Sequence, residues 1–207
     1  MHDDRHGARQ PERFDPARAA RLDDPARFEY LPPADLLALL DLAEDAILVD
    51  FGAGTGAYAI EIARARPAVL VYALDENETM LAHLREKLAK SDVANVTPIE
   101  PSELAPLKGR VDRVLALNVL HELGDASLAE LRGLLASTGK ALIVDWNADA
   151  ERPHGPPREH VYGVEEARRR LRESGLSEIG VASFPYHYAF VVVPSAGVPQ
   201  TQEPGNT

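Results

Sequence analysis

The sequence predicts an α/β domain of three layers, in which helices cover both faces of one seven-stranded, mostly parallel sheet that closes with an antiparallel C-terminal hairpin. Three observations support this class. Strand-like apolar runs alternate with segments of helical periodicity. The early runs are continuous rather than alternating, as in strands buried on both faces. The last two runs are separated by only Pro185 and Tyr186, too short a gap for a parallel crossover.

In the first half of the chain, strands are expected at 46–51, 68–75 and 95–99, and helices at 34–42, 57–65 and 77–88. The run "AILVDF" at 46–51 is short, apolar and followed at once by glycines. The segment "AYAIEIARA" then has helical spacing until Pro67 stops it. From Asn77 onward, Met80, Leu84 and Leu88 line one side of a helix.

In the second half, strands are expected at 111–118, 140–146, 178–184 and 187–193, and helices at 127–135 and 164–176. Ser127 and Glu130 have the spacing of a capping box, which predicts a helix start at Ser127. Gly175 stands where a glycine commonly ends a helix. A proline-rich loop covers 147–163, between the fifth strand and the last helix.

Length and composition favour one globular domain: 207 residues with 45% apolar content fill one core and leave no room for a second full domain. We divide the chain into an N-terminal extension (1–33, disordered to about residue 12), a domain (34–193) and a disordered tail (194–207).

The chain has no cysteine, which excludes disulfides and thiol chemistry. Its net charge of -11 disfavours nucleic-acid partners.

The stretch "DFGAGTGAY" (50–58) is the clearest ligand motif, with glycines at 52, 54 and 56 directly after a predicted strand. It fits the dinucleotide fingerprint G-x-G-x-x-G/A when Ala57 takes the last place. It also fits the looser D-x-G-x-G-x-G of S-adenosylmethionine (SAM) sites. The glycines alone therefore leave two cofactors open.

The ends of the predicted strands carry acids, namely Asp50, Asp75 and Glu100. Asp75 lies nineteen residues beyond Gly56, a spacing that suits ribose hydroxyls of either cofactor. Asp50 distinguishes the two cofactors better than Asp75 does. Its carboxylate would face two phosphates in a dinucleotide but a cationic amino and sulfonium end in SAM. Electrostatics favour the cationic cofactor.

Together these segments resemble the class I SAM-dependent methyltransferases, in particular the small-molecule, type 11-like ones. The resemblance rests on "VDFGAGTG", "VYALDENETML", "IEPSEL", "VDRVLALNVLHEL" and "GKALIVDW", which follow one another in the family's order. It implies a Rossmann-like fold, SAM as cofactor and a small-molecule acceptor. The cofactor-binding residues that it implies are Asp50, Gly52, Ala53, Gly54, Gly56, Asp75, Glu76, Met80, Glu100, Pro101, Asn118 and Val119.

Methyl transfer from a sulfonium is an in-line displacement that alignment accelerates, so it does not require a strong base. If the acceptor must lose a proton, His121 in "NVLHEL" is the first candidate and His160 in "HGPPREH" the second. By the same resemblance, the acceptor side comprises Trp146, His154, Glu159 and His160. The six-residue spacing of the two loop histidines fits no standard metal site, so no metal is expected. Phe28 and Tyr30 are candidates for a lid.

Two other classes stay open at this point. A nicotinamide-dependent oxidoreductase is kept by the Ala57 match, although the chain lacks a Tyr-x-x-x-Lys pair. A SAM-binding regulator without catalysis would share every cofactor motif.

The charged first thirty positions and the lack of a long apolar run predict a cytoplasmic protein without membrane contact. The oligomeric state is left open.

Overall fold

The computed structural model describes residues 19 and 21–196 of the chain. The predicted disorder before residue 12 and in the tail beyond residue 196 lies outside the described residues. Seven strands form one sheet in the order β3-β2-β1-β4-β5-β7-β6. They are β1 (Ile47–Phe51), β2 (Leu70–Leu74), β3 (Val96–Ile99), β4 (Val111–Leu117), β5 (Leu135–Trp146), β6 (Leu176–Ser183) and β7 (His187–Pro194).

The sheet is parallel from β3 to β5 and becomes antiparallel at β7 and β6, as the short gap at residues 185 and 186 predicted. Strand order reverses at β1, which pairs with β2 on one side and with β4 on the other. Ligands of open α/β sheets bind at such a switch point, at the carboxyl ends of the strands. The glycine motif follows β1 directly.

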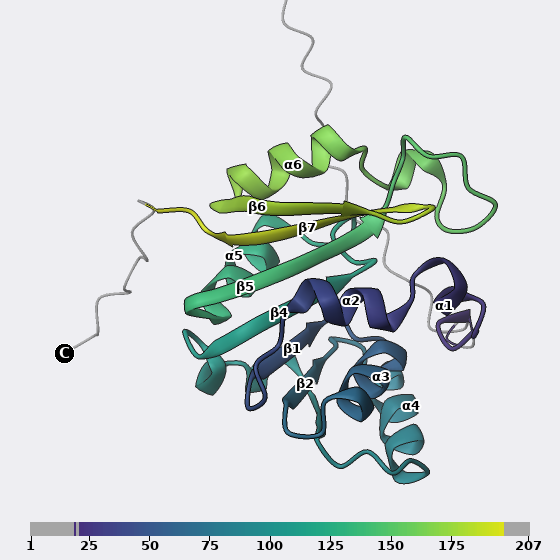
Figure 1. Ribbon diagram of the computed structural model, residues 1–207, viewed down its shortest axis with the longest axis vertical. Coiled ribbons are helices and arrows are strands. Elements are labelled where there is room, and N and C mark those ends of the chain that lie inside the picture. Colours follow the sequence, from purple (N-terminus) through teal and green to yellow (C-terminus); the bar gives the residue numbers. More distant parts are fainter. Residues whose placement is uncertain (1–18, 20, 197–207) are drawn as a thin grey trace, which may run out of the picture.

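Helices cover both faces (Figure 1), and each face has its own buried cluster. One cluster includes Leu128, Leu131 and Leu171, and the other includes Leu36 and Ile62. This confirms the three-layer class. The helices are α1 (Arg27–Tyr30), α2 (Pro33–Leu40), α3 (Ala57–Ala65), α4 (Glu78–Ala89), α5 (Asp125–Leu134) and α6 (Val164–Glu173), with 3₁₀ turns η2 (Pro101–Glu103), η3 (Ala105–Leu107) and η4 (Arg158–His160).

Two local predictions were wrong. The helix α5 begins at Asp125 with Gly124 as its N-cap, so Ser127 lies inside the first turn and makes no capping box. Strand β5 begins at Leu135 rather than Lys140, because Leu135 pairs with Val111 before an irregularity in the register. Gly175 does end α6, with a φ of +75°. The short helix α1 was not predicted.

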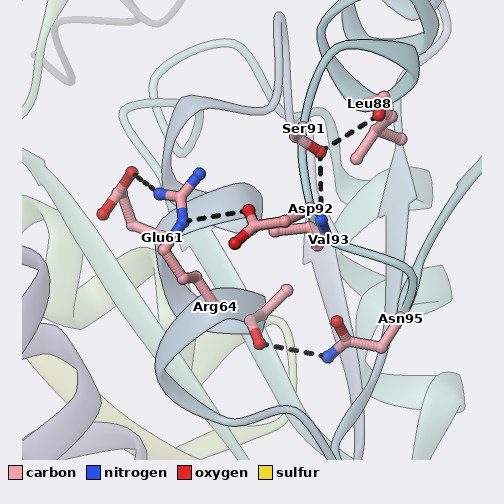
Figure 2. A network of polar contacts seen from close by, with 8 residues as sticks. Glu61, Arg64, Leu88, Ser91, Asp92, Val93 and Asn95 are labelled. Atoms are coloured by element: carbon pink, nitrogen blue, oxygen red, sulfur yellow. Dashed lines mark hydrogen bonds and ion pairs between the residues drawn. The ribbon is translucent and has the colours of Figure 1, made fainter.

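Side-chain contacts between α3 and the segment before β3 fix one edge of the sheet (Figure 2). Asn95 Nδ2 donates to the carbonyl oxygens of Ala63, Arg66 and Val69 at 3.3, 3.1 and 2.8 Å. These bonds satisfy the end of α3, whose last carbonyls have no partner within the helix. Arg64 contacts Glu61 and Asp92, but Arg64 and Asp92 are exposed and Glu61 is only partly buried, so these pairs contribute little. In the part of the chain that is described, no helix has the length and apolarity needed to cross a membrane.

Candidate functional site

The turn after β1 has a strained backbone that only glycine adopts freely. Gly52, Gly54 and Gly56 have φ values of +79°, +57° and +72°. The N–H groups of Gly52 and Ala53 both donate to the carbonyl oxygen of Leu74 at the end of β2, at 2.9 and 2.8 Å. The turn is therefore anchored to the neighbouring strand and leads directly into α3.

A side chain added at any of these glycines would force a neighbouring side chain to shift. A Cβ on Gly52 would lie 2.7 Å from Val119 Cγ1, after β4, and one on Gly54 would lie 2.9 Å from Leu22 Cδ1. A Cβ on Gly56 would overlap Leu84 of α4. Packing against Leu84 therefore explains the glycine at position 56. Gly52 and Gly54 lie between the β4 loop and the segment before α1.

The segment before α1 is fastened to the glycine turn by polar contacts. Asp23 Oδ1 accepts from Thr55 Oγ1 at 2.6 Å and from Lys87 Nζ at 2.5 Å. Lys87 Nζ also donates to the carbonyl oxygen of Thr55 at 2.9 Å. Sequence reasoning missed this contact, because nothing distinguishes Asp23 within an acid- and arginine-rich segment. The N-terminal extension is thereby part of the site.

Asp75 connects the turn to the helix after β2. Its Oδ2 accepts from the N–H of Gly54 at 2.7 Å, and its Oδ1 accepts from the N–H of Asn77 at 2.9 Å. Burial raises the pKa of Asp75, against the lowering effect of these two bonds. A carboxylate oxygen has more than one acceptor position, so both oxygens retain capacity for hydroxyl donors. Asp75 shapes the turn and suits a ribose.

Asp50 is the buried charge of the site. Its side chain is on β1, next to the turn, and the residue is only 3% exposed. Burial raises its pKa to about 7, with a further rise from the Asp75 charge and an opposing effect of Arg27. No described residue donates a hydrogen bond to this carboxylate. A buried carboxylate without donors is costly until a cation or donor meets it, so the site fits a cationic cofactor end such as that of SAM.

Asn118 stands at the end of β4 in a left-handed conformation, with a φ of +59°. Its N–H donates to the carbonyl oxygen of Val144 at 2.7 Å. Its side-chain Oδ1 is buried and has no hydrogen-bond partner among the described residues. An orphaned buried acceptor at the switch point is a further feature that suits a ligand donor.

The adenine-side candidates, Glu100 and Pro101, directly follow β3, whereas the ribose-side candidates Glu76 and Met80 follow β2. Glu100 and Glu103 form a capping box on η2, which begins at Pro101. This gives Glu100 a structural role, and the adenine assignment of Glu100 and Pro101 stays a prediction. Met80 is buried on α4 and Glu76 is exposed just before that helix, so their roles also stay predictions.

His121 and Asp145 form a buried pair between the ends of β4 and β5. The ring Nδ1 of His121 lies 2.9 Å from both carboxylate oxygens of Asp145. The backbone N–H of His121 donates to Oδ2 of the same carboxylate at 2.9 Å. Burial lowers the pKa of His121, but the charge and hydrogen bond of Asp145, with Glu122 nearby, raise it overall. Asp145 is fully buried and also accepts from the N–H of Trp146 at 2.7 Å.

Next to this pair lies a group of rings that we call the aromatic cluster: Tyr30, Trp146, His154, Tyr186 and His187. Trp146 and His187 are paired in register across β5 and β7, with ring centroids 4.1 Å apart. Sequence reasoning found Trp146, His154 and Tyr30 but missed Tyr186 and His187. The signal available was the "PYHY" hairpin, whose turn leads back to the end of β5.

The structure places the other loop candidates on η4. Glu159 lines a groove with Arg158, Asp149 and Glu166, whereas His154 joins the aromatic cluster. His160 is half-buried at the end of η4. Phe28 packs edge-on against Tyr58 rather than joining the cluster. In the described residues, no three His, Cys, Asp or Glu side chains are grouped so that they could hold a metal ion.

The chain is similar to known methyltransferases. The family model described as "Methyltransferase domain" matches residues 49–142. A SAM-dependent methyltransferase from Aquifex aeolicus, known from a crystal structure, has 30% sequence identity to this chain. The two structures match with a TM-score of 0.80, and the match covers 87% of this chain and 98% of that one. A methyltransferase from Burkholderia thailandensis, solved with 1,6-didemethyltoxoflavin and S-adenosylhomocysteine, has a TM-score of 0.66 at 21% identity, covering 86% and 82% of the two chains.

Among curated proteins, trans-aconitate 2-methyltransferase from Methylobacterium nodulans is 30% identical over 166 residues. The match covers 77% of this chain and 61% of the relative, so the chain spans less than two thirds of that protein's length. The fold, the glycine turn and these relatives lead to one conclusion. The chain belongs to the class I SAM-dependent methyltransferases, whose cofactor is SAM.

Proposed function

We propose that the protein transfers a methyl group from SAM to a small-molecule acceptor by in-line displacement. The observation that carries this proposal is the Asp50 carboxylate, buried beside the glycine turn without a hydrogen-bond donor among the described residues. A dinucleotide would bring two phosphates toward this carboxylate, whereas SAM brings a cation. The nicotinamide alternative is not favoured.

In this proposal, the backbone of Gly52 and Gly54 faces the methionine portion, Asp50 offsets its positive charge and Asp75 accepts from the ribose. When bound, SAM supplies an electrophilic methyl group on its sulfonium. The chain contributes by holding the donor and acceptor in line, which in well-aligned systems lowers a barrier by roughly 7–11 kcal/mol. The segment at Leu22 and Asp23 contacts the turn at Gly54 and Thr55.

Where the acceptor must lose a proton, we assign the base role to His121. Asp145 holds the imidazole by its Nδ1 edge and leaves Nε2 on the other edge, 3.5 Å from Glu122 Oε1. This arrangement orients the ring and stabilises the imidazolium that forms when the ring takes a proton. His160 remains the second candidate.

The relatives support an acceptor of low molecular mass. The Methylobacterium protein is named for trans-aconitate, and the Burkholderia structure contains a small heterocycle. Neither name fixes the acceptor of this chain. Cytoplasmic location stays a prediction from the sequence.

The test is transfer of labelled methyl from SAM to fractionated metabolites, with product detected by mass. Wild type should yield a labelled product, Asp75→Ala should lose most of it, and the exposed Asp92→Ala should behave as wild type. Binding of SAM without product from any fraction would instead indicate a non-catalytic SAM-binding protein. Failure to bind SAM would overturn the proposal.

A further inference from the structure

The aromatic cluster has the features of a site for a planar molecule. The rings of Tyr30 and His187 are nearly parallel, 6° apart in plane angle, with centroids 5.8 Å apart. Trp146 lies against His187, and His154 is stacked toward Tyr30 at 6.3 Å. Flat faces from α1, β5, β7 and the loop after β5 thus meet at the carboxyl edge of the sheet. Aromatic faces of this kind bind planar groups by stacking.

His187 has an unmet need for hydrogen bonds. The residue is 1% exposed, and neither ring nitrogen has a partner among the described residues. Burial lowers the pKa of His187 to about 3, helped by Arg27 and Arg152, so the ring is neutral at neutral pH. A neutral imidazole offers one donor and one acceptor. A hydroxyl or carbonyl group on a ligand would satisfy it.

Two arginines border the same cluster. The guanidinium of Arg152 lies 5.5 Å from the Trp146 ring centroid, and its Nη1 donates to the carbonyl oxygen of His154 at 3.0 Å. Arg27 lies over Tyr58, which is outside the cluster, 5.3 Å from that ring centroid, and it donates to the carbonyl oxygen of Leu22 at 2.6 Å. Its positive charge still helps to lower the pKa of His187. Within the described residues, neither forms an ion pair. In a chain of net charge -11, two such cations beside one ring cluster indicate an anionic ligand.

The cluster lies at the same strand end as the base candidate. Trp146 follows Asp145 directly on β5, and its backbone N–H donates to the carboxylate that holds the His121 imidazole. Consecutive side chains of a strand point to opposite faces of the sheet, so the Trp146 ring and the His121–Asp145 pair flank the end of β5 from its two faces. We propose that the acceptor is a planar carboxylate, aromatic or conjugated, that stacks in the aromatic cluster with its carboxylate toward Arg152. This inference rests on the proposed function.

The assay uses Trp146, the single tryptophan of the chain, as a fluorescent reporter inside the cluster. Full-length protein saturated with S-adenosylhomocysteine is titrated with two matched pairs: 4-hydroxybenzoate against 4-hydroxybenzamide, and cinnamate against cinnamamide. Cyclohexanecarboxylate tests planarity. We expect at least one planar carboxylate to bind about tenfold or more tightly than its amide and than the saturated acid.

Arg152→Gln should weaken that carboxylate by about tenfold to a hundredfold and leave the amide unchanged, because it removes one charge-assisted contact. The exposed Arg172→Gln on α6 is the matched control and should bind as wild type. Melting of each variant confirms folding, and Arg27→Gln provides a second charge removal.

The inference is overturned if no planar carboxylate binds more tightly than its amide, or if Arg152→Gln and Arg172→Gln behave alike. Calorimetry with S-adenosylhomocysteine alone separates the two proposals. Its binding without carboxylate preference contradicts only the acceptor class, whereas its failure to bind contradicts the proposed function as well.

Discussion

The imidazole Nδ1 of His121 lies 2.9 Å from both carboxylate oxygens of Asp145, joining the end of β4 to the end of β5. Because Asp145 is fully buried, its charge acts on the imidazole with little solvent screening. Asp145 therefore favours the protonated form of His121.

Asp145→Asn should lower the pKa of His121 below its ordinary 6.5, because burial then acts without the carboxylate. An NMR titration of the ring protons, assigned with His121→Gln, measures this. The raised pKa stabilises the wild-type fold below pH 6.5, and this contribution is lost as pH rises through the folded pKa. If His121 is the base, the acid limb of the activity profile moves to lower pH in the variant. An unchanged pKa would contradict the pairing.

Asp50→Asn should weaken cofactor binding and raise the stability of the fold above neutral pH. Its pKa rises from 3.8 to about 7 on folding, so its contribution to stability is full below pH 3.8 and is lost as pH rises through 7. Denaturant unfolding should show the variant to be more stable than wild type at pH 8 and equal to it below pH 4. SAM affinity should fall.

The exposed Asp45→Asn serves as the control for Asp50→Asn, and it should leave both unfolding and SAM binding unchanged. A variant of Asp50 that binds SAM as tightly as wild type would show that the buried carboxylate does not meet the cofactor.

Gly54→Ala should destabilise the protein by at least about 1 kcal/mol, because alanine is strained at φ +57° and its Cβ approaches Leu22. The cofactor should bind more weakly, since the turn and its cover both shift. Gly133→Ala in α5 meets no atom within 4 Å and should stabilise by roughly 0.5–1 kcal/mol. Thermal unfolding compares the two. Equal effects would contradict the close contact at the turn.

Asp75→Ala should weaken SAM binding on the order of tenfold to a hundredfold, through loss of charge-assisted bonds worth about 1.5–3 kcal/mol. Since Asp75 also holds the N–H groups of Gly54 and Asn77, Asp75→Asn distinguishes ribose binding from loop shape. Calorimetry provides the affinities. Unchanged affinity in Asp75→Ala would show that the ribose lies elsewhere.

The sequence predicted the strands well because apolar runs between glycine and proline breaks depend on local pattern alone. The order of β7 and β6, and hence the position of His187 beside Trp146, depends on pairing between residues 41 to 51 apart along the chain, which periodicity does not encode. The cover from Leu22 and Asp23 was missed for the same reason. The role of Asp145 was not predicted, because nothing in the sequence distinguishes a buried acid within a predicted strand from the other residues of that strand.

In the proposed function, the turn at Asp50 to Gly56 binds SAM. Thermal unfolding of the full chain with S-adenosylhomocysteine, and separately with NADH, tests it directly. At a hundredfold excess over its dissociation constant, S-adenosylhomocysteine should stabilise the fold by about 2.7 kcal/mol, and NADH should not. A shift with NADH and none with S-adenosylhomocysteine or SAM would contradict SAM binding at this turn.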